Sequence, residues 1–96
     1  MRIRLELEAS EELSAATAYL DAQSPGLGDE FVAAVSVAGK QLQDFPLSGQ
    51  KIGRGTRRVL IRRFPYQLIY RVEGDEIIIY AVARQKRRPG YWRKRL

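Results

Sequence analysis

The chain has 96 residues, enough for one domain, and it contains neither cysteine nor histidine. This composition excludes disulfides, thiolate or imidazole metal sites and every nucleophile that depends on a histidine base. The net charge of +6 is unevenly distributed, because residues 1–50 carry 3 basic and 8 acidic side chains, whereas residues 51–96 carry 14 and 3. The second half therefore predicts a surface that attracts polyanions or an acidic protein segment.

No part of the sequence has the apolar run of a signal peptide or the length of a transmembrane span. We therefore expect a single domain over residues 1–96, located in the cytoplasm and without a membrane partner. The acidic residues Glu73, Asp75 and Glu76 crowd a predicted hairpin turn. We assign them to the turn and not to a metal site, and we expect no metal and no cofactor.

The N-terminal region predicts a strand followed by a helix. Apolar and charged residues alternate from Ile3 to Leu7, which is typical of a strand near a sheet edge with one buried face. We expect the first helix to open at Ser10. Glu11 and Glu12 would then lie in its first turn, where acidic side chains interact favourably with the helix dipole.

A break at residues 23–26 separates this helix from a second, longer one. We expect Pro25 at the first helical position, where its missing N–H has no partner to lose. Apolar residues then recur every three or four positions from Leu27 to Phe45, and the stripe ends at Pro46. Two helices joined by so short a turn form an antiparallel hairpin, whose apolar faces must cover another layer.

The second half predicts strands. Residues 46–55 contain three glycines and are interpreted as a flexible loop. Strands are expected at residues 56–63, 66–72 and 76–83, with a tight turn at residues 73–75. The predicted fold is therefore α+β with the order β-α-α-β-β-β. The helical hairpin packs on one face of a small, mainly antiparallel sheet, and the other face is free for a partner.

The last strand leads directly into a basic C-terminal tail. Residues 77–83 show no polar alternation, which is typical of a strand covered on both faces. Residues 84–96 instead hold seven Lys or Arg side chains, no carboxylate, and Tyr91 and Trp92. Such a tail can pair with phosphates or carboxylates and stack on bases, or its aromatic residues can extend the core while the arginines keep the protein soluble. We expect Trp92 to be mainly structural. The residues predicted to bind a target are Arg84, Lys86, Arg87, Arg88, Tyr91, Trp92, Arg93, Lys94 and Arg95.

A second basic cluster surrounds the strand at residues 56–63. Its members are Arg54, Arg57, Arg58, Arg62 and Arg63. Alternation along the strand places them on both faces, so no more than about half can share a surface with the tail. Two explanations fit the cluster equally. The charges either protect a solvated edge strand from aggregation or bind a partner.

Six short motifs occur in one order along the chain. They are Ser24–Gly28 with Phe31, Phe45–Pro46, Arg62–Tyr66, Tyr70–Val72, Ala81–Ala83 and Arg88–Arg93. Together they resemble the RelE/ParE superfamily of toxins from bacterial type II toxin-antitoxin modules, in particular the members called plasmid stabilisation proteins. The resemblance covers nearly the whole chain, and it implies a helical hairpin on a small antiparallel sheet.

The resemblance implies one of two activities. ParE-like members inhibit DNA gyrase without being nucleases, whereas RelE-like members bind the ribosome and cleave messenger RNA with basic side chains and a tyrosine. Members of both kinds are neutralised by a cognate antitoxin, whose extended segment wraps the toxin, and a higher-order toxin-antitoxin complex is therefore an expected assembly. The residues that we predict to contact the antitoxin are Arg57, Arg62, Arg63 and Tyr66.

The nuclease residues carry over only in part. The basic position of the strand at residues 56–63 is matched by Arg58, and a tail arginine is matched by Arg87. The tail tyrosine has approximate counterparts in Tyr91 or Trp92. If the chain is a nuclease, the resemblance implies Arg58, Arg87 and Tyr91 as its catalytic residues.

Three departures from the family pattern decide the ranking of the hypotheses. Leu60 and Gln67 occupy two basic positions, which removes cations that would stabilise a phosphorane-like transition state. Related sequences usually carry a histidine where this chain has Arg84, and a permanent cation cannot carry a proton. We therefore favour a ParE-like gyrase inhibitor over a RelE-like ribosome-dependent endoribonuclease. The third hypothesis is a basic binding module without toxicity.

Overall fold

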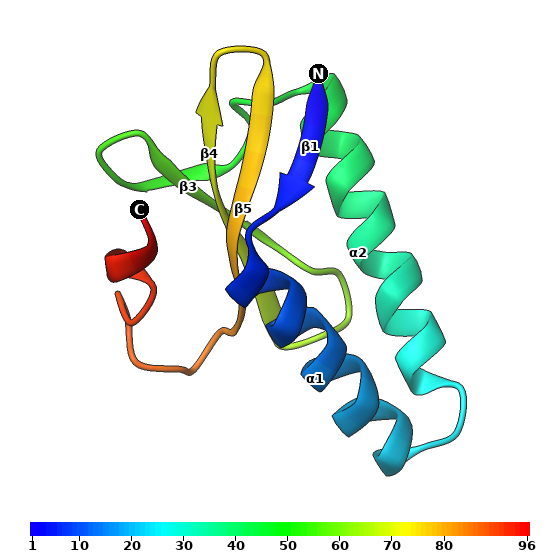
Figure 1. The fold of residues 1–96 in the computed structure, drawn as a ribbon. Helices are drawn as coiled ribbons and strands as arrows, with labels where there is room; N and C mark the ends of the chain where they lie inside the picture. The colour runs from blue at the N-terminus through cyan, green and yellow to red at the C-terminus, as the bar shows by residue number, and fades with distance from the viewer.

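The computed structural model describes all 96 residues, and it has two helices on one face of a five-stranded sheet (Figure 1). The elements are β1 (Arg2–Leu5), α1 (Leu7–Gln23), α2 (Leu27–Asp44), β2 (Gln50–Gly53), β3 (Thr56–Leu60), β4 (Tyr66–Glu73), β5 (Glu76–Arg84) and the short 3-10 helix η1 (Arg93–Arg95). The strand order is β1-β5-β4-β3-β2, with only the β1–β5 pair parallel. The predicted α+β class, the helical hairpin and the mainly antiparallel sheet are confirmed.

The boundary between the first strand and the first helix differs from the prediction. The carbonyl of Glu6 accepts a hydrogen bond from the N–H of Ser10 (2.9 Å), which closes the first turn of α1. Leu7 therefore belongs to the helix and not to the strand, and Ser10 does not open the helix. The acidic residue in the first turn is Glu8, so the first-turn assignment of Glu11 and Glu12 is wrong.

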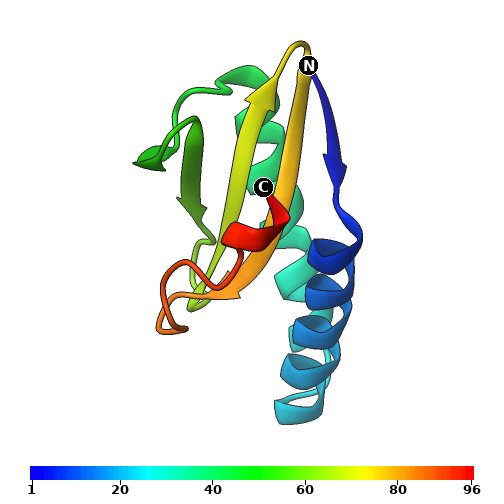
Figure 2. The ribbon, with the colours of Figure 1, turned by 60° about the vertical axis from the view of Figure 1, so that its left-hand side comes forward.

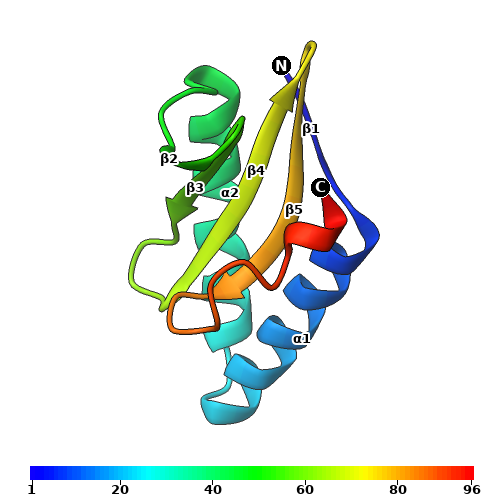
Figure 3. The same cartoon turned by 90° about the vertical axis from the view of Figure 1, so that its left-hand side faces the viewer.

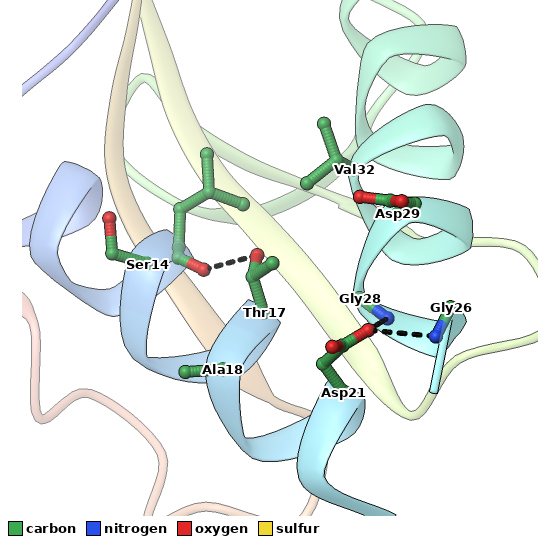
Figure 4. Close-up of a pocket in the computed structure, with 9 residues that line it drawn as sticks. Ser14, Thr17, Ala18, Asp21, Gly26, Gly28, Asp29 and Val32 are labelled. Atoms are coloured by element: carbon green, nitrogen blue, oxygen red, sulfur yellow. Dashed lines mark hydrogen bonds between the residues drawn. The ribbon is translucent and has the colours of Figure 1, made fainter. Parts of the chain in front are cut away.

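The turn between the helices also differs in detail. Gly26 caps α2 with φ of 90°, in the left-handed region that favours glycine, so Pro25 precedes the helix and does not occupy its first position. The carboxylate of Asp21 in α1 accepts hydrogen bonds from the N–H groups of Gly26 (3.0 Å) and Gly28 (3.1 Å) (Figure 4). One α1 side chain thus satisfies two donors at the start of α2, which fixes the hairpin.

The stretch between α2 and β4 contains three further corrections. Phe45 follows the last residue of α2 and is 67% exposed, so the apolar stripe does not extend to it. The predicted loop contains β2, an edge strand that pairs with β3. The next strand ends at Leu60, because the chain then turns back and Arg63 adopts φ of 71°.

The two faces of the sheet are covered differently. The helices cover one face, and the core between them and the sheet includes Phe31, Leu42, Tyr70 and Ile79. On the other face the C-terminal tail folds back, and Trp92 packs against Ile69 and Ala81. Figures 2 and 3 show this tail, coloured orange to red, against β5 on the side away from α2. The expectation that this face is entirely free is therefore wrong, because the chain covers part of it itself.

The strand β5 occupies the position predicted for it. It lies between β1 and β4, and its residues from Ile77 to Ala83 are all buried. It delivers the tail at one end of the sheet, next to α1 (Figure 1). Neither α1 nor α2 combines the length and the hydropathy that a membrane span requires.

Candidate functional site

One carboxylate of α1 fastens the tail to the sheet. Glu12 accepts hydrogen bonds from the hydroxyl of Tyr91 (2.7 Å), from Nη1 and Nη2 of Arg95 (2.8 and 3.2 Å) and from the backbone N–H of Val82 (3.0 Å). Nη1 of Arg87 lies 3.9 Å from the same carboxylate. The tail has no carboxylate of its own, so Glu12 supplies its counter-charge. We call Glu12, Tyr91 and Arg95 the tail anchor.

The anchor fixes the protonation states of its members. Burial opposes ionisation of Glu12, but the hydrogen bonds from Arg95, Tyr91 and Val82 together with the charge of Arg95 outweigh it and hold the pKa of Glu12 below its ordinary value. Burial and the hydrogen bond to Glu12 raise the pKa of Tyr91 to about 12. At neutral pH the anchor therefore consists of an ionised Glu12 that accepts hydrogen bonds from the neutral phenol of Tyr91 and from the guanidinium of Arg95.

Stacking adds to these contacts. The guanidinium carbons of Arg87 and Arg95 lie 3.8 and 5.1 Å from the centre of the Tyr91 ring, and that of Arg93 lies 5.9 Å from the Trp92 ring. Trp92 itself is 7% exposed, in agreement with the mainly structural role expected for it. Three of the residues predicted to bind a target, Tyr91, Trp92 and Arg95, are thus engaged in internal contacts.

A small cleft of about 150 Å³ opens between the tail and the sheet, and we call it the basic cleft. Arg58 of β3 lies on its wall, where its Nε donates to Oε1 of Gln50 (2.9 Å) and its Nη1 to Oε1 of Gln67 (3.4 Å). No acidic residue lines the cleft. The lining residues are Ile52, Arg58, Gln67, Ile69, Gln85, Arg87, Pro89, Gly90, Trp92 and Arg93.

The structure brings together two of the three residues implied for a nuclease. Arg58 and Arg87 both line the basic cleft, whereas Tyr91 does not line it and donates its hydroxyl to Glu12. Gln67, which stands where the family pattern has a cation, lies in the cleft beside Arg58. The cleft therefore offers guanidinium and amide groups, which suit an anion, but no group that exchanges protons near neutral pH.

The remaining tail cations are exposed and do not line the cleft. Lys86, Arg88 and Lys94 make no ion pair and no side-chain hydrogen bond within the chain. Arg84 lies at the end of β5, with its guanidinium carbon 5.7 Å from the centre of the Tyr19 ring. These side chains are free to meet a negatively charged partner.

The four residues predicted to contact an antitoxin do not form one surface. Nη1 of Arg57 donates to two carbonyls of the segment before β2 (3.0 and 2.9 Å), and Tyr66 is 5% exposed. Arg62 and Arg63 are exposed and line a groove beside α2, where Arg63 pairs with Glu30 (3.0 Å). Only the latter two arginines are therefore placed to meet another protein.

A larger hollow of about 560 Å³ lies between the helices (Figure 4). Its polar groups serve the hairpin, since Asp21 bonds the N–H groups of Gly26 and Gly28, and Thr17 donates to the carbonyl of Leu13 (2.7 Å). We assign it a structural role.

Sequence reasoning missed Glu12. The sequence spacing could have identified this residue. Glu12 falls three residues after Ala9 and four before Ala16, both of which are buried, so it lies on the buried face of the helix. A carboxylate on the buried stripe of a helix requires hydrogen-bond donors from elsewhere in the chain. The tail is the segment with donors in excess.

The helical hairpin on a mainly antiparallel sheet, with a basic tail folded over the other face, defines a small α+β protein. A chain of a solved structure described as the chromosomal ParDE toxin-antitoxin system from P. aeruginosa is similar in fold, with a TM-score of 0.76 and 24% sequence identity over 88% of this chain and 95% of that chain. The family described as the ParE toxin of the type II toxin-antitoxin system parDE matches residues 3–89. The chain belongs to this family. No curated protein matches it.

Proposed function

We propose that this ParE-family toxin inhibits growth by binding DNA gyrase in the cytoplasm and that a cognate antitoxin neutralises it. Family membership supports the toxin role. The observation that carries the mechanism is the composition of the basic cleft, which holds arginines and glutamines, while burial and the hydrogen bond to Glu12 raise the pKa of the nearby Tyr91 further from neutral, to about 12. General acid-base catalysis needs a group whose pKa lies near the working pH, so this cleft suits binding better than hydrolysis.

The second candidate is a RelE-like ribosome-dependent ribonuclease. The convergence of Arg58 and Arg87 on one cleft favours it, because two guanidiniums can stabilise the charge of a phosphoryl transition state. A basic binding module without toxicity is the third candidate. It shares the exposed cations with the other two but predicts no effect on either target.

The decisive experiment adds the free protein separately to a gyrase supercoiling reaction and to a translating ribosome with a defined messenger. We expect gyrase inhibition and an intact message. Arg87→Gln should weaken the inhibition, whereas Arg2→Gln, the same charge change at a 75% exposed side chain of β1, should not. Cleaved message with unaffected gyrase would favour the ribonuclease over the gyrase inhibitor. No effect in either reaction would reject both targets.

The groove beside α2 is the surface that we propose for the antitoxin. It measures about 550 Å³ and combines the cations Arg62 and Arg63 with apolar side chains, among them Val37, which is 62% exposed. A segment with alternating acidic and apolar residues fits this composition. Binding of the adjacent gene product should weaken in the Arg62→Gln, Arg63→Gln double variant and not in Arg2→Gln. An affinity unchanged by the double variant would exclude the groove.

A further inference from the structure

We propose that the basic cleft is a non-catalytic slot for a single phosphodiester group of a nucleic-acid strand, and that Glu12 is the positioning residue that assembles it. The inference deepens the proposed function, since a toxin that binds gyrase meets DNA on its target. The slot itself can be tested without gyrase.

The first argument is the gathering of guanidinium groups. Arg58, Arg87 and Arg93 converge on the cleft from two parts of the chain, β3 and the tail. No carboxylate lies among the lining residues, and Arg93 makes neither an ion pair nor a side-chain hydrogen bond. Guanidinium groups present donors in a planar fork that matches the oxygens of a phosphate. Arg87 has the carboxylate of Glu12 at 3.9 Å, but Arg58 and Arg93 have no counter-charge within the chain, and a phosphate group would supply one.

The second argument is size. A volume of about 150 Å³ is well below the roughly 300–1,000 Å³ of pockets that hold drug-sized molecules. Trp92 is 7% exposed, so its ring is not available as a platform for a base. The cleft therefore admits one backbone group and not a nucleotide. Binding should be independent of the base sequence, because phosphate contacts carry no sequence information.

The third argument concerns the rest of the partner. Lys86, Arg88 and Lys94 are exposed and unpaired on the same tail. A single slot on a tail that carries further free cations next to Arg87 and Arg93 in the sequence suits a ligand whose negative charge repeats along its length, as the phosphates of a nucleic-acid strand do. A lone acidic side chain would leave these cations without partners.

Glu12 acts on the slot without touching it. Its side chain is 16% exposed and is absent from the cleft lining, but it holds Tyr91 and Arg95 and attracts Arg87. These contacts place the tail across the sheet, opposite Arg58. Loss of the carboxylate would release the tail arginines from the geometry in which they converge with β3.

The test measures binding of a fluorescent oligothymidine of about 12 nucleotides by anisotropy at about 50 and 200 mM salt. For each phosphate contact on a single strand, this change in salt lowers the affinity by about 2.6-fold. Because the slot holds one phosphate, Arg58→Gln and Arg93→Gln should each reduce the wild-type salt effect, and the double variant should reduce it by the full factor of about 2.6. The matched control Arg2→Gln lies on β1, remote from the cleft lining, and should leave the salt effect unchanged.

The variant Glu12→Gln should reproduce the double variant, whereas Glu11→Gln, at an exposed position of the same helix, should not. If Glu12→Gln fails to fold, the two arginine variants still decide the question. Equal losses in Arg2→Gln and Arg58→Gln would overturn the slot in favour of diffuse charge attraction. Tighter binding of a polyglutamate peptide than of the oligothymidine would overturn the nucleic-acid assignment. Gyrase inhibition by a protein that binds no oligothymidine would overturn the slot and leave the proposed function standing.

Discussion

Replacing Glu12 by glutamine removes the charge that holds the tail and keeps the length of the side chain. The new amide places N–H donors against the guanidinium of Arg95, which can only donate, and it removes one of the two oxygens that accept from Tyr91, Arg95 and Val82. Hydrogen bonds to charged groups contribute about 1.5–3 kcal/mol. Because the side chains of Glu12 and Arg95 are 16% and 17% exposed, water replaces part of the loss. We expect the free energy of unfolding to fall by about 2–3 kcal/mol.

Urea unfolding followed by the fluorescence of Trp92, the single tryptophan, measures this loss where the tail docks. The pKa of Glu12 is lowered in the folded state, so its contribution is present above the unfolded pKa of about 4.3 and is lost as pH falls through the folded value. The difference between wild type and Glu12→Gln should therefore be complete at neutral pH and shrink below about pH 4. A loss no greater than that of Glu11→Gln, or one independent of pH, would refute the role of the anchor.

Three further predictions concern packing and protonation. Gly28→Ala should destabilise the hairpin by about 1–3 kcal/mol, because the added Cβ would lie 2.7 Å from the carbonyl oxygen of Thr17. The control Gly39→Ala, at a half-buried helix position where the added Cβ would make an ordinary contact with Ile3 at 3.6 Å, should instead stabilise by about 0.5–1 kcal/mol. Tyr70→Phe should lower the free energy of unfolding in urea by about 1–3 kcal/mol. The buried hydroxyl accepts a hydrogen bond from the N–H of Gly49 (2.9 Å) and donates one to the carbonyl of Pro46 (2.8 Å), both in the segment before β2. In an absorbance titration, Tyr91 should ionise near pH 12, and Glu12→Gln should bring it closer to the ordinary value of about 10.

The fold was largely predictable because its patterns are local. A helical stripe and short apolar strands identified the hairpin and the central strands. The strand β2 could not be predicted, since its four residues, Gln50–Gly53, show no apolar alternation and include a glycine. It is held by non-local contacts, namely its pairing with β3 and the hydrogen bonds from Arg57 to the preceding carbonyls. Such pairing leaves no trace in the segment itself.

The site was predictable in composition and not in geometry. The excess of cations after β5 located the tail, and the position of Arg58 located the other wall of the cleft. Which cations are free depends on a contact between residues 12 and 95, which no local pattern encodes. The sequence therefore could not separate Arg95, which is held by Glu12, from Lys94, which is exposed.

Salt should separate these two groups of cations. The bonds of Glu12 to Arg95 and Tyr91 are partly buried and short, so mobile ions screen them weakly. Exposed side chains such as Lys86 and Lys94 are screened fully. Their contacts to a polyanion weaken because the free energy gained by releasing counterions falls as the salt concentration rises. Raising salt from about 50 to 200 mM should therefore leave the Trp92 emission of the free protein unchanged while oligonucleotide binding falls steeply. A shift of Trp92 emission in parallel with the loss of binding would mean that salt detaches the tail, and the anchor would then be a surface ion pair without a positioning role.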